Sequence, residues 1–378
     1  MVIGIDCHNL EKERTGVGRY LANLLQQWSK FEIQNNLRFI LYFHKKIPDD
    51  EFLQNPIFEK KLLRFWPKPS FLIYFLFLLP RAFKKDRVDL AFFPGYMVPF
   101  TYTGRSVMVI HDLAYEAFPE VFPLRYKIPY RIFSRYGSKK SKAIITVSEF
   151  SKKEIERFYG ISPEKIFVTP LGVAETFKQI SDELILEKIK QKYGIEKNFI
   201  LHLGQIFYRR HVLESIAAFK KIAGDFPDFQ FLLIGKNWLK EDLGAILKEV
   251  NSEIGREVLT WKLFAPDDEL VLLYNAASLV LYLSDYEGFG LPPLEAMACG
   301  TPVLTTNFAS LKETAGDCAI IVNDPKNIDE IAKKISKGLL DFDLREKIIE
   351  KGLKNVQKYS WERCASQTLR ILLNCLPR

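Results

Sequence analysis

The sequence predicts an α/β protein with two domains, each built on a doubly wound parallel sheet. A chain of 378 residues is longer than one average domain. Short apolar runs without polar alternation recur along it, as in strands that are buried on both faces of a parallel sheet. These runs alternate with stretches whose apolar residues recur at helical spacing. Ligands of such sheets bind at the carboxyl ends of the strands, so we expect the site there.

The apolar runs predict strands in both halves of the chain. Those of the first half lie at 2–6, 37–43, 88–93, 106–110, 143–147 and 166–169. Those of the second half lie at 199–204, 231–234, 258–264, 278–283, 303–305 and 319–322. We therefore place the first domain at residues 1–178 and the second at 179–360.

Composition and charge narrow the classes of function. Apolar residues make up 48% of the chain and charged residues 26%, both ordinary for a globular protein. The five cysteines lack C-x-x-C spacing, which argues against a disulfide framework or a zinc site. The amino terminus resembles a strand and not a signal peptide, so we expect a cytoplasmic protein. The net charge of +8 suits acidic ligands or an anionic membrane surface. No nucleic-acid-binding signature accompanies it, so nucleic acid is not an expected partner.

The most informative stretch follows the predicted strand 278–283. Two prolines at 292 and 293 suit the first positions of a helix, so residues 287–291 form a loop between strand and helix. Gly288 and Gly290 permit close backbone approach. The amides and the helix dipole then favour an anion. Glu287 in the loop and Glu295 in the helix could bind hydroxyls. A sugar nucleotide offers both features, although a plain glycine-rich turn with solvated carboxylates is the alternative.

Three further segments carry candidate residues. Arg209 and Arg210 lie in a strand-to-helix loop, where guanidinium groups suit phosphate oxygens, although surface arginines are common. His111 ends the predicted strand 106–110, where a ligand-binding role competes with a structural one. Gly16, Val17 and Gly18 form a glycine loop before the first helix, for which a tight turn is the alternative.

Two segments have the composition of a membrane-binding surface. The unbroken apolar run within 66–87 is nine residues long, too short for a span of about 20 residues, and basic residues follow it. It is either a core helix or an interfacial segment. Residues 125–142 carry seven basic residues and no acidic one, with aromatic residues between them. This predicts either docking on anionic lipid or a basic surface above a buried aromatic stripe.

These motifs together resemble those of the retaining glycosyltransferases of family four. The two glutamates flank seven residues, and the run E-A-M-A-C-G-T-P-V from Glu295 matches that family's signature. The His-Asp pair at 111–112, the S-E-F-S run at 148–151 and Arg209-Arg210 occur in the expected order. The resemblance spans nearly the whole chain. It implies the GT-B fold, in which two Rossmann-like domains face each other across a cleft and a C-terminal helix (361–378) returns to the first domain.

The resemblance also implies roles for the candidate residues. The leaving diphosphate would be held by Arg210, by Arg209 and by the amides of Phe289, Gly290 and Leu291, so that no metal is required. Glu295 would bind the ribose and Glu287 the sugar hydroxyls. His111 would orient the sugar, and the loop of Gly16, Val17 and Gly18 would face the sugar and the diphosphate. Gln205 and Leu263 depart from the family pattern. Gln205 implies fewer diphosphate contacts from its loop, and because of Leu263 the resemblance does not indicate which nucleotide base is bound.

The expected reaction is transfer of a hexosyl unit with retained anomeric configuration. The donor would be a GDP- or UDP-linked sugar, with mannose favoured because the chain resembles bacterial mannosyltransferases of surface polysaccharide assembly. The acceptor would be a saccharide, free or lipid-linked, at the inner face of the membrane. A catalytically silent sugar-nucleotide-binding subunit or membrane scaffold is the alternative, and the sequence does not distinguish front-face attack from a covalent intermediate. The D-x-D at 341–343 is interpreted as a helix cap and not as a metal site.

Overall fold

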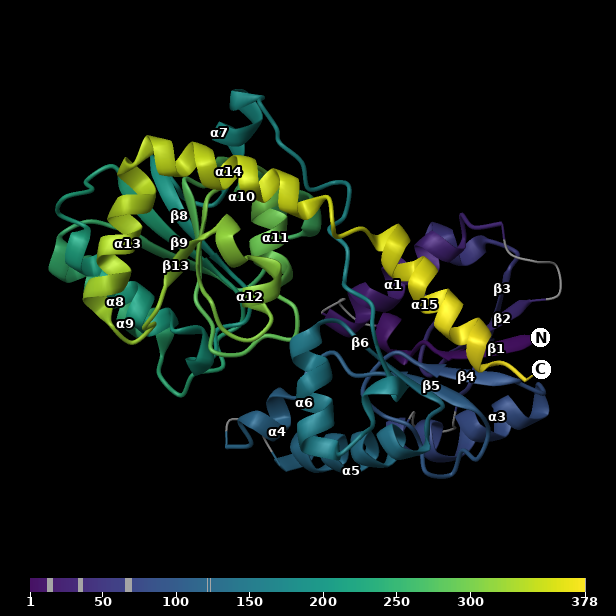
Figure 1. Ribbon diagram of the computed structural model, residues 1–378. Coiled ribbons are helices and arrows are strands. Elements are labelled where there is room, and N and C mark those ends of the chain that lie inside the picture. The colour runs from purple at the N-terminus through teal and green to yellow at the C-terminus, as the bar shows by residue number, and fades with distance from the viewer. Residues whose placement is uncertain (12–15, 33–36, 65–69, 121, 123, 378) are drawn as a thin grey trace. The chain divides into compact units, whose positions relative to one another are not determined.

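The computed structural model describes residues 1–11, 16–32, 37–64, 70–120, 122 and 124–377, and divides into two compact units (Figure 1). The first unit comprises Met1–Gly172 and Trp361–Arg378, and the second comprises Val173–Ser360. The first unit ends at Gly172, before the predicted boundary at residue 178, because the segment after it binds to the second unit. Ile180 N donates to Asn275 Oδ1 (2.7 Å), and Asn275 Nδ2 donates to Lys178 O (3.0 Å).

The first unit contains a seven-stranded sheet with the order β3-β2-β1-β4-β5-β6-β7. Every neighbouring pair in it is parallel. Its strands are β1 (Val2–Asp6), β2 (Arg38–Phe43), β3 (Phe58–Leu62), β4 (Leu90–Phe93), β5 (Ser106–Val109), β6 (Ala143–Thr146) and β7 (Ile166–Val168). All of them except β3 were predicted from apolar runs.

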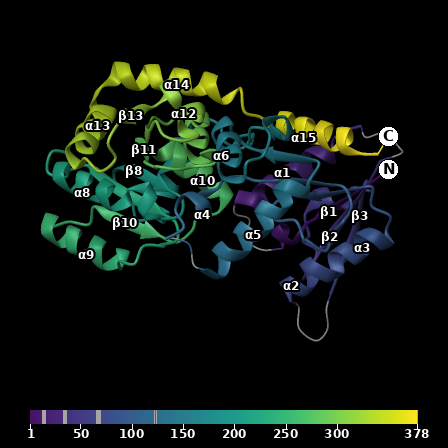
Figure 2. The same cartoon turned by 60° about the horizontal axis from the view of Figure 1, so that its bottom comes forward.

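Helices cover both faces of this sheet (Figures 1 and 2). They are α1 (Gly16–Trp28), α2 (Phe71–Ile73), a π-helical turn (Tyr74–Leu78), α3 (Leu79–Lys85), α4 (Ala114–Ala117), α5 (Leu124–Lys140), α6 (Glu149–Tyr159) and α15 (Trp361–Cys375). On one face α15 packs beside α1, and Trp28 Nε1 donates to Ala365 O (3.0 Å). On the other face α3 and α5 contribute Phe83 and Phe133 to one buried core. The last helix of the chain therefore completes the first unit.

The second unit contains a six-stranded parallel sheet with the order β10-β9-β8-β11-β12-β13. Its strands are β8 (Asn198–Leu203), β9 (Phe229–Ile234), β10 (Leu259–Lys262), β11 (Leu279–Tyr282), β12 (Val303–Thr306) and β13 (Ile320–Val322). Its helices are α7 (Glu183–Lys192), α8 (Val212–Ile222), α9 (Leu243–Ile254), α10 (Asp267–Ala276), α11 (Leu291–Ala298), α12 (Leu311–Thr314), α13 (Ile328–Leu340) and α14 (Phe342–Val356).

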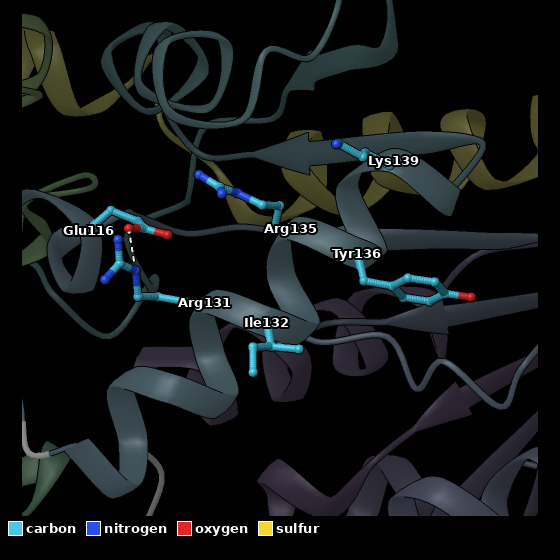
Figure 3. A pocket seen from close by; sticks show the side chains of 6 residues that line it. All are labelled: Glu116, Arg131, Ile132, Arg135, Tyr136 and Lys139. Atoms are coloured by element: carbon cyan, nitrogen blue, oxygen red, sulfur yellow. Dashed lines mark ion pairs between the residues drawn. The ribbon is translucent and has the colours of Figure 1, made fainter.

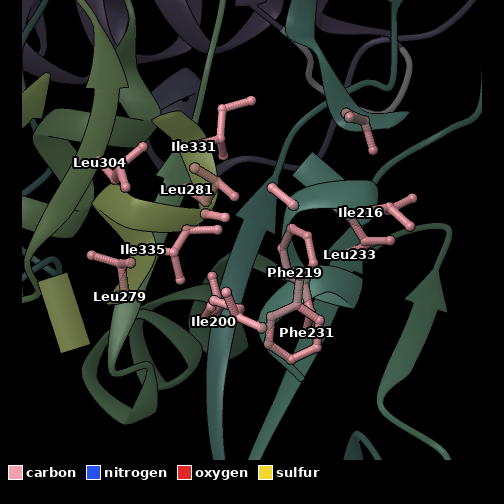
Figure 4. Close-up of a cluster of buried hydrophobic side chains, with 14 of the residues drawn as sticks. Ile200, Ile216, Phe219, Phe231, Leu233, Leu279, Leu281, Leu304, Ile331 and Ile335 are labelled. Carbon is pink, nitrogen blue, oxygen red and sulfur yellow. The ribbon is translucent and has the colours of Figure 1, made fainter. Parts of the chain in front are cut away.

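One buried cluster joins this sheet to α8 and α13 (Figure 4). Phe219 of α8 packs against Phe231 of β9, and Ile335 of α13 belongs to the same cluster. In the D-x-D at 341–343, the Asp341 side chain accepts a hydrogen bond from Leu344 N (3.0 Å) at the start of α14. The predicted cap is confirmed.

Each sheet reverses its strand order once. In the first unit the reversal falls between β1 and β4, and in the second between β8 and β11. Loops leaving the two central strands diverge at such a switch point, and the crevice between them is where open α/β sheets bind ligands. The fold therefore marks one position in each unit, at the carboxyl ends of these strands.

The two segments with membrane-like composition are only partly buried. In α2, the π-helical turn and α3, Tyr74 and Phe83 are in the core, whereas Leu72 and Phe77 are 57% and 46% exposed. The segment thus combines a core face with an exposed apolar face, and residues 66–69 of the predicted range lie outside the described residues. In the part of the chain that the structure describes, no helix is long and apolar enough to cross a bilayer.

Candidate functional site

The switch point of the second unit brings together two loops that are far apart in the sequence. The loop after β8 contains a 3-10 turn (Tyr208–Arg210), and the loop after β11 leads into α11. Asp285 N donates to Arg209 O (2.9 Å) and joins the loops directly. Because β8 and β11 are neighbours in the sheet, their carboxyl ends present these loops side by side.

Arg210 and Glu287 form a buried ion pair between these loops. Arg210 Nε lies 2.9 Å from Glu287 Oε1, and Arg210 Nη2 lies 3.2 Å from Glu287 Oε2. Both side chains are about nine-tenths buried, and Ser284 Oγ donates to Glu287 Oε1 (2.9 Å). Burial alone would raise the pKa of Glu287, but Arg210 and Arg209 lower it to about 2. Glu287 is therefore ionised at neutral pH.

The position of Arg210 depends on a glycine at the end of β8. A Cβ on Gly204 would lie 2.4 Å from Arg210 Nη1, so only glycine leaves room for the guanidinium. Arg210 Nη1 donates to Gln205 O (2.9 Å), and the guanidinium carbon lies 5.0 Å from the centre of the Tyr282 ring. These contacts fix the charge of Arg210 at the carboxyl end of the sheet.

Arg209 is held beside Arg210 by different contacts. Its Nε donates to Tyr286 O (3.1 Å), and its guanidinium lies 4.6 Å from the centre of the Phe207 ring. The structure thus gathers two guanidinium groups and one buried carboxylate at this switch point.

The loop of residues 287–291 is oriented by α12. Ser310 Oγ donates to Glu287 O (2.8 Å), and Thr314 Oγ1 donates to Phe289 O (3.0 Å). A trans peptide directs its C=O and N–H to opposite sides, so the amides of Gly288 and Gly290 point away from α12. Gly290 has a φ of 94°, precedes the first residue of α11, Leu291, and has no room for a Cβ beside Leu311. The arrangement suits an anion at the start of α11.

Glu295 lies one turn into α11 and is buried. Tyr274 OH of α10 donates to Glu295 Oε2 (2.9 Å). Neither this tyrosine nor Ser284 was among the residues predicted from the sequence, because only the packing of α10 and β11 brings them to the glutamates.

His211 adds a second ion-pair contact between the two loops. It adopts a left-handed conformation (φ 47°) immediately before α8, and its Nε2 lies 2.9 Å from Asp285 Oδ1. Glu214 Oε1 lies 3.4 Å from its Nδ1. Burial alone would lower the pKa of His211, but Asp285 and Glu214 raise it to about 9. Sequence reasoning missed this residue, since no motif singled it out.

The remaining predicted site residues belong to the first unit. His111 follows β5, and its Nε2 donates to Pro94 O (2.9 Å), so Nδ1 is the unprotonated nitrogen. Burial lowers the pKa of His111 to about 4, and the side chain is neutral at pH 7. Its ring makes an edge contact with Tyr20 at 4.9 Å.

Gly16, Val17 and Gly18 are in the first turn of α1 and not in a loop before it. The prediction of a glycine loop at these positions is wrong, because neither glycine adopts a positive φ and both continue the helix.

A separate pocket of about 420 Å³ lies between α4 and α5 in the first unit (Figure 3). Arg131 Nε lies 2.7 Å from Glu116 Oε2, and Arg135 lies one turn further along α5. The complete lining consists of Glu116, Arg131, Ile132, Arg135, Tyr136 and Lys139. None of the predicted site residues lines this pocket, which is basic with one apolar and one aromatic wall.

Comparison with known proteins agrees with this geometry. The family model "Glycosyl transferases group 1" matches residues 186–355, and "Glycosyltransferase Family 4" matches residues 14–177. The chain is 30% identical to O-antigen chain mannosyltransferase B of Escherichia coli, over 94% of this chain and 95% of that protein. It is 26% identical to O-antigen chain mannosyltransferase RfbU of Salmonella typhimurium, over 65% of this chain and 68% of that protein.

Solved structures share the fold of the whole chain. One is Alr3699/HepE of Anabaena in complex with UDP and glucose, with a TM-score of 0.76, 18% identity and full coverage of both chains. Another is WaaG, a glycosyltransferase involved in lipopolysaccharide biosynthesis, with a TM-score of 0.73, 18% identity and coverage of 98% of this chain and 99% of that one. The chain therefore has the GT-B fold and belongs to glycosyltransferase family four, as a hexosyltransferase.

Proposed function

We propose that this protein transfers a mannosyl unit from GDP-mannose to a hydroxyl of a saccharide acceptor, free or lipid-linked, in the assembly of a bacterial surface polysaccharide. An O-antigen, a capsule or an exopolysaccharide would be such a product. Two relatives that match most of this chain are named as O-antigen chain mannosyltransferases. The observation that carries the proposal is the convergence of Arg209, Arg210 and the loop of residues 287–291 at the switch point of the second unit.

The charges at this switch point suit a nucleoside diphosphate leaving group. As the sugar–phosphate bond breaks, negative charge develops on the diphosphate, and guanidinium groups and amides fixed around it stabilise that charge. Arg209, Arg210 and the amides of Phe289, Gly290 and Leu291 would provide this stabilisation. We infer that turnover needs no divalent metal and survives EDTA, because these groups already supply the positive charge.

The carboxylates have distinct proposed roles. Glu287 holds Arg210 in place, and its remaining acceptor capacity would serve a hydroxyl of the donor sugar. Glu295, fixed by Tyr274, would accept hydrogen bonds from the ribose. The neutral His111 would orient the sugar through its unprotonated Nδ1. Retention of the anomeric configuration is part of the proposal, whether by front-face attack or through a covalent intermediate.

A panel of nucleotide sugars tests this function. Purified protein is incubated with GDP-mannose, UDP-glucose or UDP-N-acetylglucosamine, and the released nucleoside diphosphate is measured with and without membrane lipid extract. Release from GDP-mannose that is lost in Glu287→Gln supports the proposal. Release from a UDP sugar alone contradicts the choice of donor. Binding of GDP without release from any donor indicates a catalytically silent subunit.

We further propose that α5 docks on an anionic membrane surface. Leu124, Ile128 and Ile132 are spaced four residues apart on one face of α5 and are 64%, 50% and 55% exposed. The helix contains six basic residues and no acidic one, so an apolar stripe lies among positive charges. The exposed apolar face of residues 71–85 belongs to the same unit and would add to this surface.

Sedimentation with vesicles tests this surface. We expect the protein to bind vesicles of phosphatidylglycerol at low salt, and the double variant Ile128→Ser/Ile132→Ser to bind them less. Leu184→Ser, which removes a 74% exposed leucine from α7, is the control. Failure of the unmodified protein to bind these vesicles at low salt would contradict the docking proposal.

A further inference from the structure

The first unit has a switch point of its own, and the residues there have no assigned role. In the second unit the switch point between β8 and β11 holds the candidate donor site. The corresponding position in the first unit lies between β1 and β4, whose carboxyl ends are at Asp6 and Phe93. Open α/β sheets bind ligands at this position, so the chain immediately after β1 is where a second ligand is expected.

Asp6 and His8 form a hydrogen-bonded pair at this position. His8 Nδ1 lies 2.9 Å from Asp6 Oδ1 and 3.0 Å from Asp6 Oδ2. Tyr74 OH donates to Asp6 Oδ1 (2.8 Å), so the carboxylate is fixed from a second side. A carboxylate oxygen accepts this hydrogen bond, so the proton lies on His8 Nδ1, and in the neutral imidazole Nε2 is then an acceptor.

The two side chains of this pair differ in exposure, as expected for a buried group that orients a binding group. The Asp6 side chain is 3% exposed, whereas the His8 side chain is 18% exposed. The buried carboxylate orients the imidazole, and the imidazole presents its other nitrogen at the surface. This is the arrangement in which a third group holds a functional histidine in one tautomer.

Aromatic rings complete the surroundings of His8. Its ring centre lies 4.8 Å from that of Phe71 and 6.4 Å from that of Tyr74. Phe71 is only partly buried, so an aromatic surface lies beside the acceptor nitrogen. A sugar ring fits such a place, because it presents C–H groups on its faces and hydroxyl donors at its edge.

The other four histidines are engaged differently. His111 Nε2 binds Pro94 O, and His211 lies between two carboxylates. The Nε2 atoms of His44 and His202 are buried and have no hydrogen-bond partner among the described residues. His8 thus differs from them in combining a fixed tautomer with a partly exposed ring at a switch point.

We propose that His8, oriented by Asp6, binds the saccharide acceptor by accepting a hydrogen bond from one of its hydroxyl groups at Nε2. The proposal rests on the proposed function, because it assumes that the first unit receives a sugar acceptor. It adds an acceptor-binding residue that neither the motifs nor the comparisons indicate, and it predicts which nitrogen meets the hydroxyl.

Kinetics with a synthetic acceptor test this role. GDP-mannose is the donor and octyl α-D-mannopyranoside the probe acceptor, and both transfer to the mannoside and donor hydrolysis without it are measured. In His8→Ala we expect kcat/KM for the acceptor to fall about 10- to 100-fold, with hydrolysis unchanged within about twofold, because one hydrogen bond to the acceptor alone is lost. His8→Gln, which keeps an acceptor atom, should recover part of the loss.

His44→Phe is the matched control for packing. His44 contacts the same Tyr74 ring (5.0 Å) but is buried, so its replacement should leave the ratio of transfer to hydrolysis unchanged. Asp6→Ala removes the oxygen that accepts the His8 Nδ1 proton, so the imidazole is no longer held in one tautomer, a change visible in its ¹⁵N spectrum, and transfer should fall as in His8→Ala. Transfer that is unaffected in His8→Ala, or hydrolysis that falls in parallel with it, would overturn the proposal.

Failure of the proposed function is distinguishable from failure of this inference. If the unmodified protein releases no nucleoside diphosphate from any donor, the proposed function fails. The inference is then decided by saturation-transfer NMR with octyl α-D-mannopyranoside. A signal that is lost in His8→Ala supports acceptor binding at His8, and equal signals from the two proteins, including none, overturn it.

Discussion

At the scale of single residues, the ion pair of Arg210 and Glu287 is the centre of the candidate site. Each charge is buried and each is compensated by the other, so neither can be removed without leaving an unpaired charge. The pair also places a guanidinium at the carboxyl end of β8, where a phosphate would lie. The residues proposed to act on the donor are therefore also the ones that neutralise each other's buried charge.

Glu287→Gln should be both destabilising and inactivating. It leaves the Arg210 guanidinium buried without a counter-charge, which costs about 3 kcal/mol of unfolding free energy. Denaturant unfolding measures the loss, and release of nucleoside diphosphate measures the activity. Glu187→Gln, which removes the 56% exposed partner of Lys190, is the control and should change stability by less than about 1 kcal/mol. If the two variants were equally stable, the buried ion pair would contribute no more to the free energy of unfolding than the exposed one does, which would contradict this prediction.

His211 predicts a pH dependence of stability. Its pKa is raised from 6.5 to about 9 in the folded protein. The stabilisation from its contacts with Asp285 and Glu214 is therefore complete below the unfolded pKa and is lost as the pH rises through about 9. The full effect is up to about 3 kcal/mol.

His211→Asn tests this dependence, because asparagine tolerates the left-handed backbone but carries no charge. Between pH 6.5 and 9.5 the melting temperature of the unmodified protein should fall more than that of the variant. Parallel curves for the two proteins would mean that His211 is not charged in the folded state.

At the scale of elements, the loops after β8 and β9 are packed backbone to backbone. A Cβ on Gly235 would lie 1.9 Å from Gly204 O, and Gly235 has a φ of 147°. The loop that carries Arg209 and Arg210 can therefore keep its course only if residue 235 has no side chain. The position of the loop proposed to bind phosphate thus depends on a glycine in a neighbouring loop.

Gly235→Ala should displace this loop. We expect it to lower stability by about 2 kcal/mol or more and to weaken binding of GDP, since the added carbon meets backbone atoms that cannot move aside. Calorimetry gives both quantities. Gly224→Ala is the matched control, because nothing lies within 4 Å of its Cβ position. If Gly235→Ala binds GDP as the unmodified protein does, the two loops are not coupled.

The elements also show what the sequence could predict. Apolar runs identified every strand except β3, whose sequence Phe58–Leu62 contains three charged residues. It pairs only with β2 at the edge of the sheet, and its side chains are mostly half-buried, so it needs no apolar run. The glycines at 16 and 18 did not mark a loop, because glycine can also adopt helical backbone angles in the first turn of a helix, where Gly16 is exposed and Gly18 is buried.

At the scale of the whole molecule, the contacts that build the site could not be predicted from the order of residues in the sequence. The residues of both loops were predicted, but Arg210 and Glu287 are 77 positions apart and meet because β11 pairs with β8 across the switch point. In the first unit Asp6 and Tyr74, which are 68 positions apart, meet because the π-helical turn packs against the carboxyl ends of β1 and β2. Motifs therefore predicted which loops form the candidate site, whereas the fold determined which side chains pair.

The most direct test of the account is the affinity for GDP, measured by isothermal titration calorimetry. Arg210→Lys keeps the charge but cannot form two parallel hydrogen bonds, so the account predicts binding about 10-fold weaker than in the unmodified protein. Arg256→Lys is the control, because Arg256 donates to the carbonyls of Ala223 and Phe226 before β9, at the amino end of that strand and not at the carboxyl ends that form the site. Equal affinities of the unmodified protein and Arg210→Lys would contradict the assignment of the donor site to the switch point of the second unit.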